Sequence, residues 1–236
     1  MRARTLAGLG VVGAAAVWSA PAPAAFSSKL AAALGIRRRL AGGRGIALTF
    51  DDGPHASGTP AVLAELARAR AQATFFLVGE QVERMPAIAA EIAAAGHEIG
   101  LHGYRHWPLL GRTPRALALD LDRAEALIED ATGVSPRCYR PPYGVFSLAG
   151  LAHCRRRAWE PLLWSRWGRD WGPHETPQAI ARRATEKLCA GDVVLLHDAD
   201  HYSSPGSWRR TAAALPSVLE SSLALGEPLV SVTQST

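Results

Sequence analysis

Two adjacent carboxylates, Asp51 and Asp52, stand where a short apolar run gives way to Gly53 and Pro54. Neighbouring side chains diverge on an extended backbone, so one carboxylate can bind a metal ion while the other faces a substrate. An ordinary polar turn accounts for the same four residues. The motif taken alone does not separate these two interpretations.

Two histidines four positions apart, His102 and His106, follow a second apolar run. One helical turn would place both imidazoles on a common face, although a pair taken alone is also typical of surface histidines. Together with Asp52 they make two histidines and one carboxylate, the ligand set of a catalytic zinc site with a position left for water and substrate. We expect Zn²⁺ here, and nitrogen and oxygen ligands also suit Co²⁺, Ni²⁺ or Mn²⁺.

A third histidine, His197, ends the apolar run 193–196. A buried core histidine is the alternative, but the position at the end of a strand favours a functional role. Arg140 follows another apolar run and precedes two prolines, which fix the backbone so that the guanidinium can be held against a carboxylate.

Asp170 is the one acid in a tryptophan-rich segment, between Trp167 and Trp171. The two indoles could stack on sugar rings, and buried core tryptophans are an equally common use of the residue. An acid beside a catalytic histidine would favour the charged imidazolium and raise its pKa.

The elements that must position these residues alternate along the chain. Short apolar runs predict strands at 46–50, 73–78, 98–101, 138–140, 161–164, 193–196 and 229–232. The stretches between them predict helices at 59–70, 81–95, 113–131, 147–157, 176–189 and 207–225, three of which open on Thr-Pro, an N-cap before proline. Seven such units imply an α/β fold with parallel strands, either a (β/α) barrel or an open doubly wound sheet, and function at the carboxyl ends of the strands.

The five chemistry-bearing segments, in this order and spacing, resemble the five motifs of the polysaccharide deacetylase family (the NodB homology domain, carbohydrate esterase family 4) over about residues 45–232. The resemblance implies a distorted (β/α) barrel of about seven parallel strands and metal-dependent hydrolysis of acetyl groups on a sugar. By this resemblance, Asp52, His102 and His106 bind the metal ion. Asp51 is the general base and Arg140 orients it. His197 is the general acid, and Asp170 is the acid paired with it.

The expected reaction is removal of N-acetyl groups from a polysaccharide that contains N-acetylglucosamine, such as peptidoglycan or a chitin-like glycan. Tyr143, Trp167 and Trp171 are the expected substrate-binding residues. O-acetyl ester hydrolysis on a xylan-like glycan is the alternative. A non-catalytic module that binds wall glycan would keep the tryptophans but has no need of the acid and the base.

The chain departs from the family's pattern at two positions. Gly103 stands where the second motif usually carries Ser or Thr after its first histidine, so we expect a hydrogen bond that steadies that loop to be missing. Trp167 replaces the first Asp of the fourth motif. Metal binding should survive both changes, whereas substrate preference and the tuning of His197 should respond to them.

The N-terminus has the pattern of an export signal. Arg2 and Arg4 precede an apolar run at 6–18, and small residues follow at 22–24. We predict a signal peptide or an uncleaved N-terminal anchor at 1–25, a linker at 26–45 and the catalytic domain at 46–236. The protein is therefore expected to be secreted or extracytoplasmic, with membrane association if the segment is retained.

The composition limits the remaining classes of protein that the chain could belong to. With 48% hydrophobic and 20% charged residues in 236, one globular domain and a monomer are expected. The formal net charge of +5 is too small and scattered to indicate a nucleic-acid partner. Cys138, Cys154 and Cys189 form no C-x-x-C pair, and they are expected to be small buried hydrophobes or to make at most one disulfide.

Overall fold

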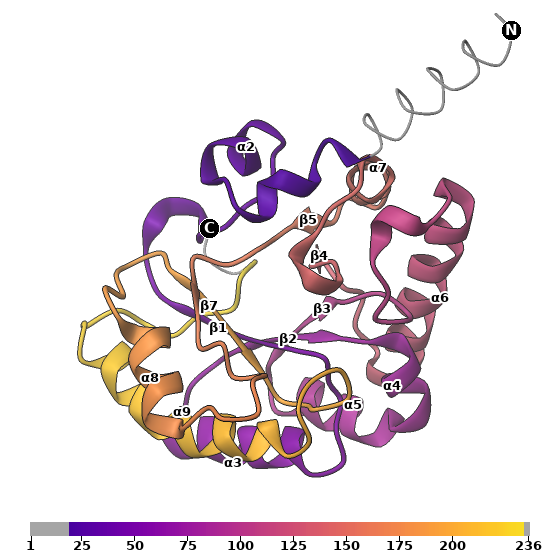
Figure 1. Cartoon of the computed structure of the whole chain (residues 1–236). Helices are drawn as coiled ribbons and strands as arrows, with labels where there is room; N and C mark the ends of the chain where they lie inside the picture. The colour runs from indigo at the N-terminus through magenta and orange to yellow at the C-terminus, as the bar shows by residue number, and fades with distance from the viewer. Residues whose placement is uncertain (1–18, 234–236) are drawn as a thin grey trace, which may run out of the picture.

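A computed structural model describes residues 19–233 (Figure 1). Seven parallel strands form one sheet in the order β5-β4-β3-β2-β1-β7-β6. The strands are β1 (Ala47–Asp51), β2 (Thr74–Leu77), β3 (Glu98–Leu101), β4 (Cys138–Tyr139), β5 (Glu160–Pro161), β6 (Arg166–Trp167) and β7 (Val193–His197). The sheet curls into an open barrel, so the expected fold class is confirmed.

Helices cover the outer surface of the sheet, as Figure 1 shows. They are α3 (Gly58–Ala69), α4 (Gly79–Arg84), α5 (Pro86–Ala94), α6 (Pro114–Thr132), α7 (Leu148–Arg157), α8 (Pro177–Thr185) and α9 (Ser207–Leu223). The side chains of Thr113 and Thr176 cap α6 and α8 by accepting backbone N–H groups, as their Thr-Pro pairs predict. The third pair differs, because α3 begins at Gly58 and Thr59 lies inside it.

The alternation of side chains along β1 determines which side of the sheet Asp51 faces. Leu48 and Phe50 point into the larger apolar core under the helices. Ala47 belongs to a smaller apolar cluster inside the barrel. Because side chains alternate along a strand, Thr49 and Asp51 point to the same side as Ala47. Asp51 therefore stands at the carboxyl end of the barrel interior, above a layer of apolar side chains.

Several predicted element boundaries differ from the structure. The stretch 229–232 contributes a single bridge between Ile46 and Leu229, and the seventh strand is instead β6. The helix expected at 81–95 is two helices, because Pro86 cannot continue the hydrogen bonding of α4. The helix expected at 176–189 ends at Thr185, and Lys187 adopts a left-handed conformation.

The stretch 26–45, interpreted from its composition as a linker, differs most from expectation. It contains helix α2 (Ser28–Ala33), and Ile36 and Leu40 are buried. Arg37 forms a parallel bridge with Leu162 and Arg39 an antiparallel bridge with Asp192. This segment therefore fills the gap between the edges of the open barrel.

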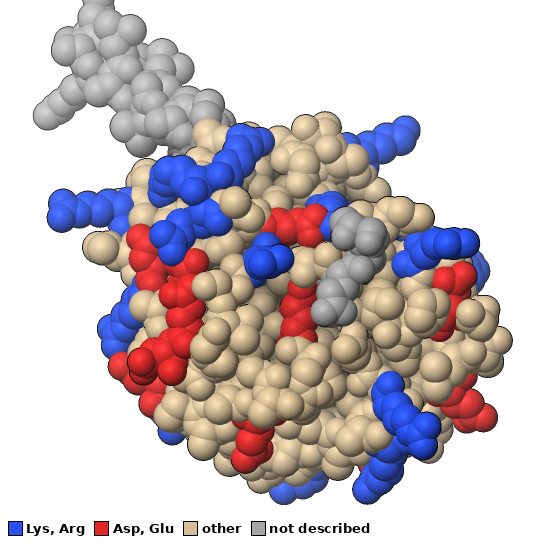
Figure 2. All heavy atoms as spheres, turned by 180° about the vertical axis from the view of Figure 1, so that it is seen from behind, with Lys and Arg blue, Asp and Glu red and all other residues tan. Residues whose placement is uncertain are grey.

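The rest of the chain adds three observations. Most of the predicted export signal, residues 1–18, lies outside the described residues; within 19–233 no helix is long and apolar enough to cross a membrane. The three cysteines are free, and Cys189 is exposed whereas Cys138 and Cys154 are buried. Figure 2 shows acidic and basic side chains lying beside one another over the face turned away in Figure 1.

Candidate active site

Asp52, His102 and His106 come together at the carboxyl end of the barrel. Asp52 Oδ1 lies 3.3 Å from His106 Nε2 and 3.5 Å from His102 Nε2, and the three ligand atoms lie within 4.8 Å of one another. This carboxylate oxygen is buried and has no hydrogen-bond partner within residues 19–233. A buried acceptor facing two imidazole nitrogens fits a divalent cation.

The backbone after β1 separates the two carboxylates. Asp52 has φ 78°, which turns its side chain away from the direction that Asp51 takes at the end of the strand. Gly53 follows because a Cβ there would lie 2.5 Å from a carboxylate oxygen of Asp198. The Gly53 carbonyl accepts the Val78 N–H at 2.9 Å, which ties this turn to the end of β2.

Arg140 holds Asp51. The guanidinium is fully buried, donates to Asp51 Oδ1 at 2.6 Å and to Thr49 Oγ1 at 2.9 Å, and lies 4.0 Å from the centre of the Phe76 ring. The other oxygen, Asp51 Oδ2, lies 3.8 Å from His102 Nε2. One face of this carboxylate is thus fixed and the other faces the metal-ligand cluster.

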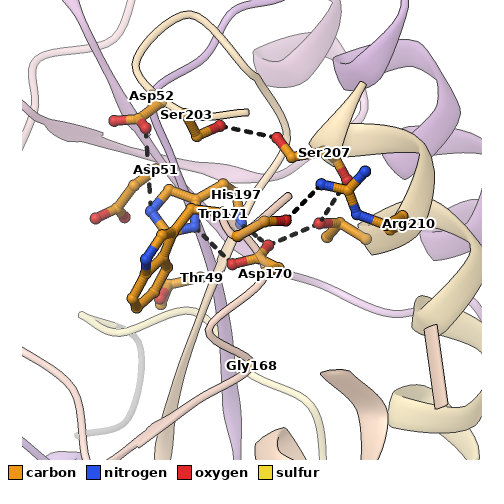
Figure 3. Close-up of polar contacts among 12 residues, drawn as sticks. Thr49, Asp51, Asp52, Gly168, Asp170, Trp171, His197, Ser203, Ser207 and Arg210 are labelled. Atoms are coloured by element: carbon orange, nitrogen blue, oxygen red, sulfur yellow. Dashed lines mark hydrogen bonds and ion pairs between the residues drawn. The ribbon is translucent and has the colours of Figure 1, made fainter. Parts of the chain in front are cut away.

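His197 pairs with Asp170, as Figure 3 shows. His197 Nδ1 lies 2.8 Å from Asp170 Oδ1, while Asp170 Oδ2 accepts the His197 backbone N–H and the Thr211 hydroxyl. Burial lowers the pKa of His197, but the charge and hydrogen bond of Asp170 outweigh it and raise that pKa to about 10. His197 therefore carries a proton at neutral pH, with Nε2 4.0 Å from Asp52 Oδ2.

His106, beside Asp52, has the opposite tuning to His197. Burial lowers the pKa of His106 to about 4, so this imidazole is neutral, the form that binds metal ions. Burial raises the pKa of Asp52, but contact with His102 and the charges of His197, His106 and His102 bring it down to about 2. The cluster thus offers two nitrogens and an ionised carboxylate.

These groups share one cavity of about 300 Å³. Its walls are Asp51, Asp52, His102, His106, Tyr143, Gly144, Trp164, Trp167, Trp171, Leu195, His197, Tyr202 and Ser203. Eight of the ten site residues expected from the sequence are in that set. The other two, Arg140 and Asp170, are fully buried behind Asp51 and His197.

Three indoles form one wall of the cavity. Trp164 and Trp167 stack with ring centres 5.9 Å apart, and Trp167 and Trp171 lie 5.4 Å apart. Trp167 is 39% exposed, so the residue that departs from the family's pattern is not core. Tyr143, which also lines the cavity, is exposed and left-handed at φ 60°.

The loop after β3 is steadied from elsewhere in the chain. Gly103 has φ 92°, a conformation that disfavours Ser or Thr. The carboxylate of Asp120, on α6, accepts the Tyr104 backbone N–H at 2.9 Å and pairs with Arg112 at 3.3 Å. The hydrogen bond expected to be lost at Gly103 thus has a counterpart from another element.

Sequence reasoning did not assign roles to several residues around the cavity. Tyr202 and Ser203 follow the end of β7 after a gap that no motif marks. Asp198, directly after His197, is fully buried, accepts a hydrogen bond from Thr59, and has its pKa raised to about 7 by burial. The His-Asp pair in the sequence was a signal for Asp198, whereas nothing local indicated Tyr202 or Asp120.

Comparison with known proteins agrees with this geometry. The family model for polysaccharide deacetylase matches residues 39–154. A peptidoglycan-N-acetylglucosamine deacetylase of Bacillus cereus is 32% identical over 192 residues, covering 80% of this chain and 86% of that protein. A chitooligosaccharide deacetylase of Azorhizobium caulinodans is 34% identical over 156 residues, covering 65% and 73%.

Solved structures give the same result. The Bc1960 peptidoglycan N-acetylglucosamine deacetylase, crystallised with a naphthalenyl N-oxidanyl-benzamide, superposes with a TM-score of 0.79 at 27% identity, covering 85% of this chain and 92% of that one.

Proposed function

Because this chain belongs to the polysaccharide deacetylase family, whose members include hydrolytic deacetylases, we propose that it removes N-acetyl groups from a polysaccharide containing N-acetylglucosamine, such as peptidoglycan or a chitin-like glycan. One observation carries the proposal. The candidate metal ligands, a carboxylate held by a buried arginine, and a histidine paired with a buried acid all face one cavity.

Asp52, His102 and His106 would hold the metal ion, and we assign Zn²⁺ before Co²⁺, Ni²⁺ or Mn²⁺ because the donors are two imidazoles and one carboxylate. When bound, such an ion polarises the acetyl carbonyl and lowers the pKa of water towards neutrality. The buried Asp52 Oδ1 without a hydrogen-bond partner within residues 19–233 supports this assignment.

Two proton transfers are assigned to this chain's own side chains. Asp51 takes a proton from the attacking water through the oxygen that Arg140 leaves free. His197 gives a proton from Nε2 to the sugar nitrogen as the bond to the acetyl carbon breaks. Asp170 stabilises the imidazolium and holds its ring through Nδ1. The backbone N–H of Tyr143, at the cavity wall, is the donor that we assign to the acetyl oxygen.

The raised pKa of His197 favours amide over ester substrates. An amine leaves only after its nitrogen is protonated, and His197 keeps its proton well above neutral pH. An ester's alcohol is a better leaving group and depends less on such an acid. We therefore rank O-acetyl hydrolysis on a xylan-like glycan second, and a non-catalytic wall-binding module below it, because both the acid and the base are present.

The place of action is part of the proposal. Arg2 and Arg4, the apolar run at 6–18 and the small residues at 22–24 support export, with the segment cleaved or retained as an anchor. We propose that the protein works as an extracytoplasmic monomer. Fractionation of cells followed by N-terminal sequencing tests cleavage, and light scattering of the purified protein tests its oligomeric state.

Acetate release from peptidoglycan, chitooligosaccharides and acetylxylan, each with and without chelator, tests the proposed function. The expected result is chelator-sensitive release from one or both N-acetylated substrates. Release from acetylxylan alone would favour the ester alternative. No release from any substrate after reloading with metal, or full activity after exhaustive chelation checked by elemental analysis, would contradict the proposal.

A further inference from the structure

The two histidines of the metal-ligand cluster are held in different ways. His102 Nδ1 lies 2.7 Å from the Arg140 carbonyl oxygen, so this nitrogen donates and Nε2 is left to face Asp52. Such a hydrogen bond is the usual means of fixing a ligating imidazole. His106 Nδ1 is buried and has no hydrogen-bond partner among residues 19–233. Its ring must be oriented by something else.

Aromatic contact supplies that orientation. The Tyr202 ring stacks on His106 with centres 4.3 Å apart and planes inclined by 12°. Tyr143 meets the same imidazole edge-on at 4.6 Å, but Tyr143 is 59% exposed. Tyr202 is the better-supported of the two, and its ring covers a full face of the imidazole.

The phenol of Tyr202 is fixed at its far end. Its hydroxyl donates to Glu80 Oε1 at 2.7 Å and accepts from Gln81 Nε2 at 3.0 Å. Glu80 and Gln81 are in the first turn of α4. Two polar partners at one hydroxyl leave the ring little freedom to tilt.

The same turn of α4 also holds the loop that carries His106. The Gly79 N–H donates to the Gly103 carbonyl at 2.8 Å, and the Glu80 N–H donates to the Tyr104 carbonyl at 2.9 Å. One helix end therefore fixes both the backbone beneath His106 and the side chain stacked on it. The imidazole is placed relative to Asp52 by these contacts together.

The loop that carries Tyr202 is anchored on the turn after β1. His201 Nε2 lies 3.1 Å from the Pro54 carbonyl oxygen, and Asp200 contacts His55 Nε2 at 3.2 Å. The second Asp200 oxygen accepts the Gly206 N–H at 2.6 Å. Tyr202 is thus held at its hydroxyl by α4, and its loop is held by the turn after β1.

We propose that Tyr202 is a positioning residue of the metal centre, whose stacked ring, fixed by Glu80 and Gln81, holds His106 with Nε2 directed at Asp52. The proposal rests on the metal site of the proposed function. It concerns affinity for the ion rather than the chemical step, so metal binding can test it without a turnover assay.

The main test compares Tyr202→Leu and Tyr202→Phe by chelator competition for Zn²⁺ and Co²⁺ on the metal-free full chain. Tyr202→Leu, which removes the aromatic face, should raise the metal Kd by about 10- to 100-fold, the range for lost supporting contacts of a ligating histidine. Tyr202→Phe keeps the face and should bind much closer to wild type. At saturating metal, kcat should largely recover and KM should not change.

Trp159→Leu is the matched control. Trp159 makes a ring contact with His153, a histidine outside the metal-ligand cluster and the loops that support it, at 5.3 Å, and its replacement should leave the metal Kd unchanged. If Tyr202→Leu does not fold, Glu80→Ala loosens the ring without removing it and should weaken metal binding by a smaller factor.

Three results would overturn the inference. The first is an unchanged metal Kd in both Tyr202→Leu and Glu80→Ala. The second is a raised KM with an unchanged metal Kd, which would make Tyr202 a substrate contact. The third is a loss of metal affinity in Trp159→Leu equal to that in Tyr202→Leu. Wild type that binds metal in these experiments upholds the metal site whatever the variants do. Wild type that binds none would contradict both the proposed function and this inference.

Discussion

Asp51 and Asp52 are consecutive, yet their carboxylates have different partners. Asp51 is bonded to Arg140, whereas Asp52 faces two imidazole nitrogens. Asp51→Asn should therefore retain metal and lose about two or more orders of magnitude in kcat, the scale of removing a general base. Asp52→Asn should release metal. Elemental analysis beside steady-state kinetics checks both, and equal metal content in the two variants would contradict the division of roles.

The proton on His197 depends on Asp170. Since a general acid works only when protonated, activity falls as pH rises through its pKa, which Asp170 helps to raise to about 10 despite burial. Asp170→Asn removes the charge, so that pKa should fall and the alkaline limb of the pH–rate profile should move to lower pH. Thr211→Val, which removes one hydrogen bond to Asp170, is the control and should move the limb much less. An unmoved limb in Asp170→Asn would exclude His197 as the acid.

The exposure of Trp167 bears on glycan length. An indole that is 39% exposed in the cavity wall can stack on a sugar ring. Trp167→Ala should raise KM for long oligosaccharides more than for a monosaccharide, with little change in Tm. A loss of about 3–5 kcal/mol in stability, as for truncation of a buried aromatic, with equal effects on all substrates would instead indicate a packing role.

At the scale of elements, the loop after β3 depends on its glycine. Gly103 and Gly96 both have positive φ, 92° and 81°, so Gly103→Ser and Gly96→Ser should each cost about 1–3 kcal/mol in urea unfolding. A Cβ at Gly103 would also lie 3.3 Å from the Arg105 carbonyl oxygen, whereas nothing lies within 4 Å at Gly96. Only Gly103→Ser should weaken metal binding. Equal metal affinity in the two variants would show that the loop tolerates a side chain.

The elements that the sequence predicts well are marked either by a short apolar run or by a long helical pattern. β1, β3 and α6 fall within a residue or so of expectation. Strand β6 has two residues, one of them charged, so no apolar run marks it, while the apolar stretch 229–232 meets the sheet at one bridge only. Whether so short a segment pairs as a strand depends on the segments that lie beside it in the fold, and the local sequence does not show these.

The residues of the candidate site also fall into a group that local sequence patterns predict and a group that they do not. The ten expected residues sit in recognisable motifs at strand ends, and the structure brings them together. Tyr202 and Asp120 act through contacts with residues far away in the sequence, such as the bond from Tyr202 to Glu80, 122 positions apart. No local pattern predicts such contacts, because they depend on how α4, α6 and the loop after β7 pack.

At the scale of the whole molecule, the segment before β1 is part of the domain. A chain beginning at residue 46 would lack the buried Ile36 and Leu40 and both bridges from Arg37 and Arg39. It should unfold at a lower temperature than a chain beginning at residue 19, because the barrel edges lose the segment between them. Thermal unfolding of the two proteins checks this. Equal Tm values would restore the interpretation of 26–45 as a linker.

The three indoles of the cavity wall have an optical consequence. Of the seven tryptophans in the chain, Trp164, Trp167 and Trp171 line one cavity, and Trp171 lies edge-on to His197 at 5.7 Å. A sugar ring that covers Trp167 would remove water from an emitting group, and a protonated imidazole quenches a nearby indole. The intrinsic fluorescence of the unlabelled protein should therefore report both glycan binding and the titration of His197, in the absence of any turnover.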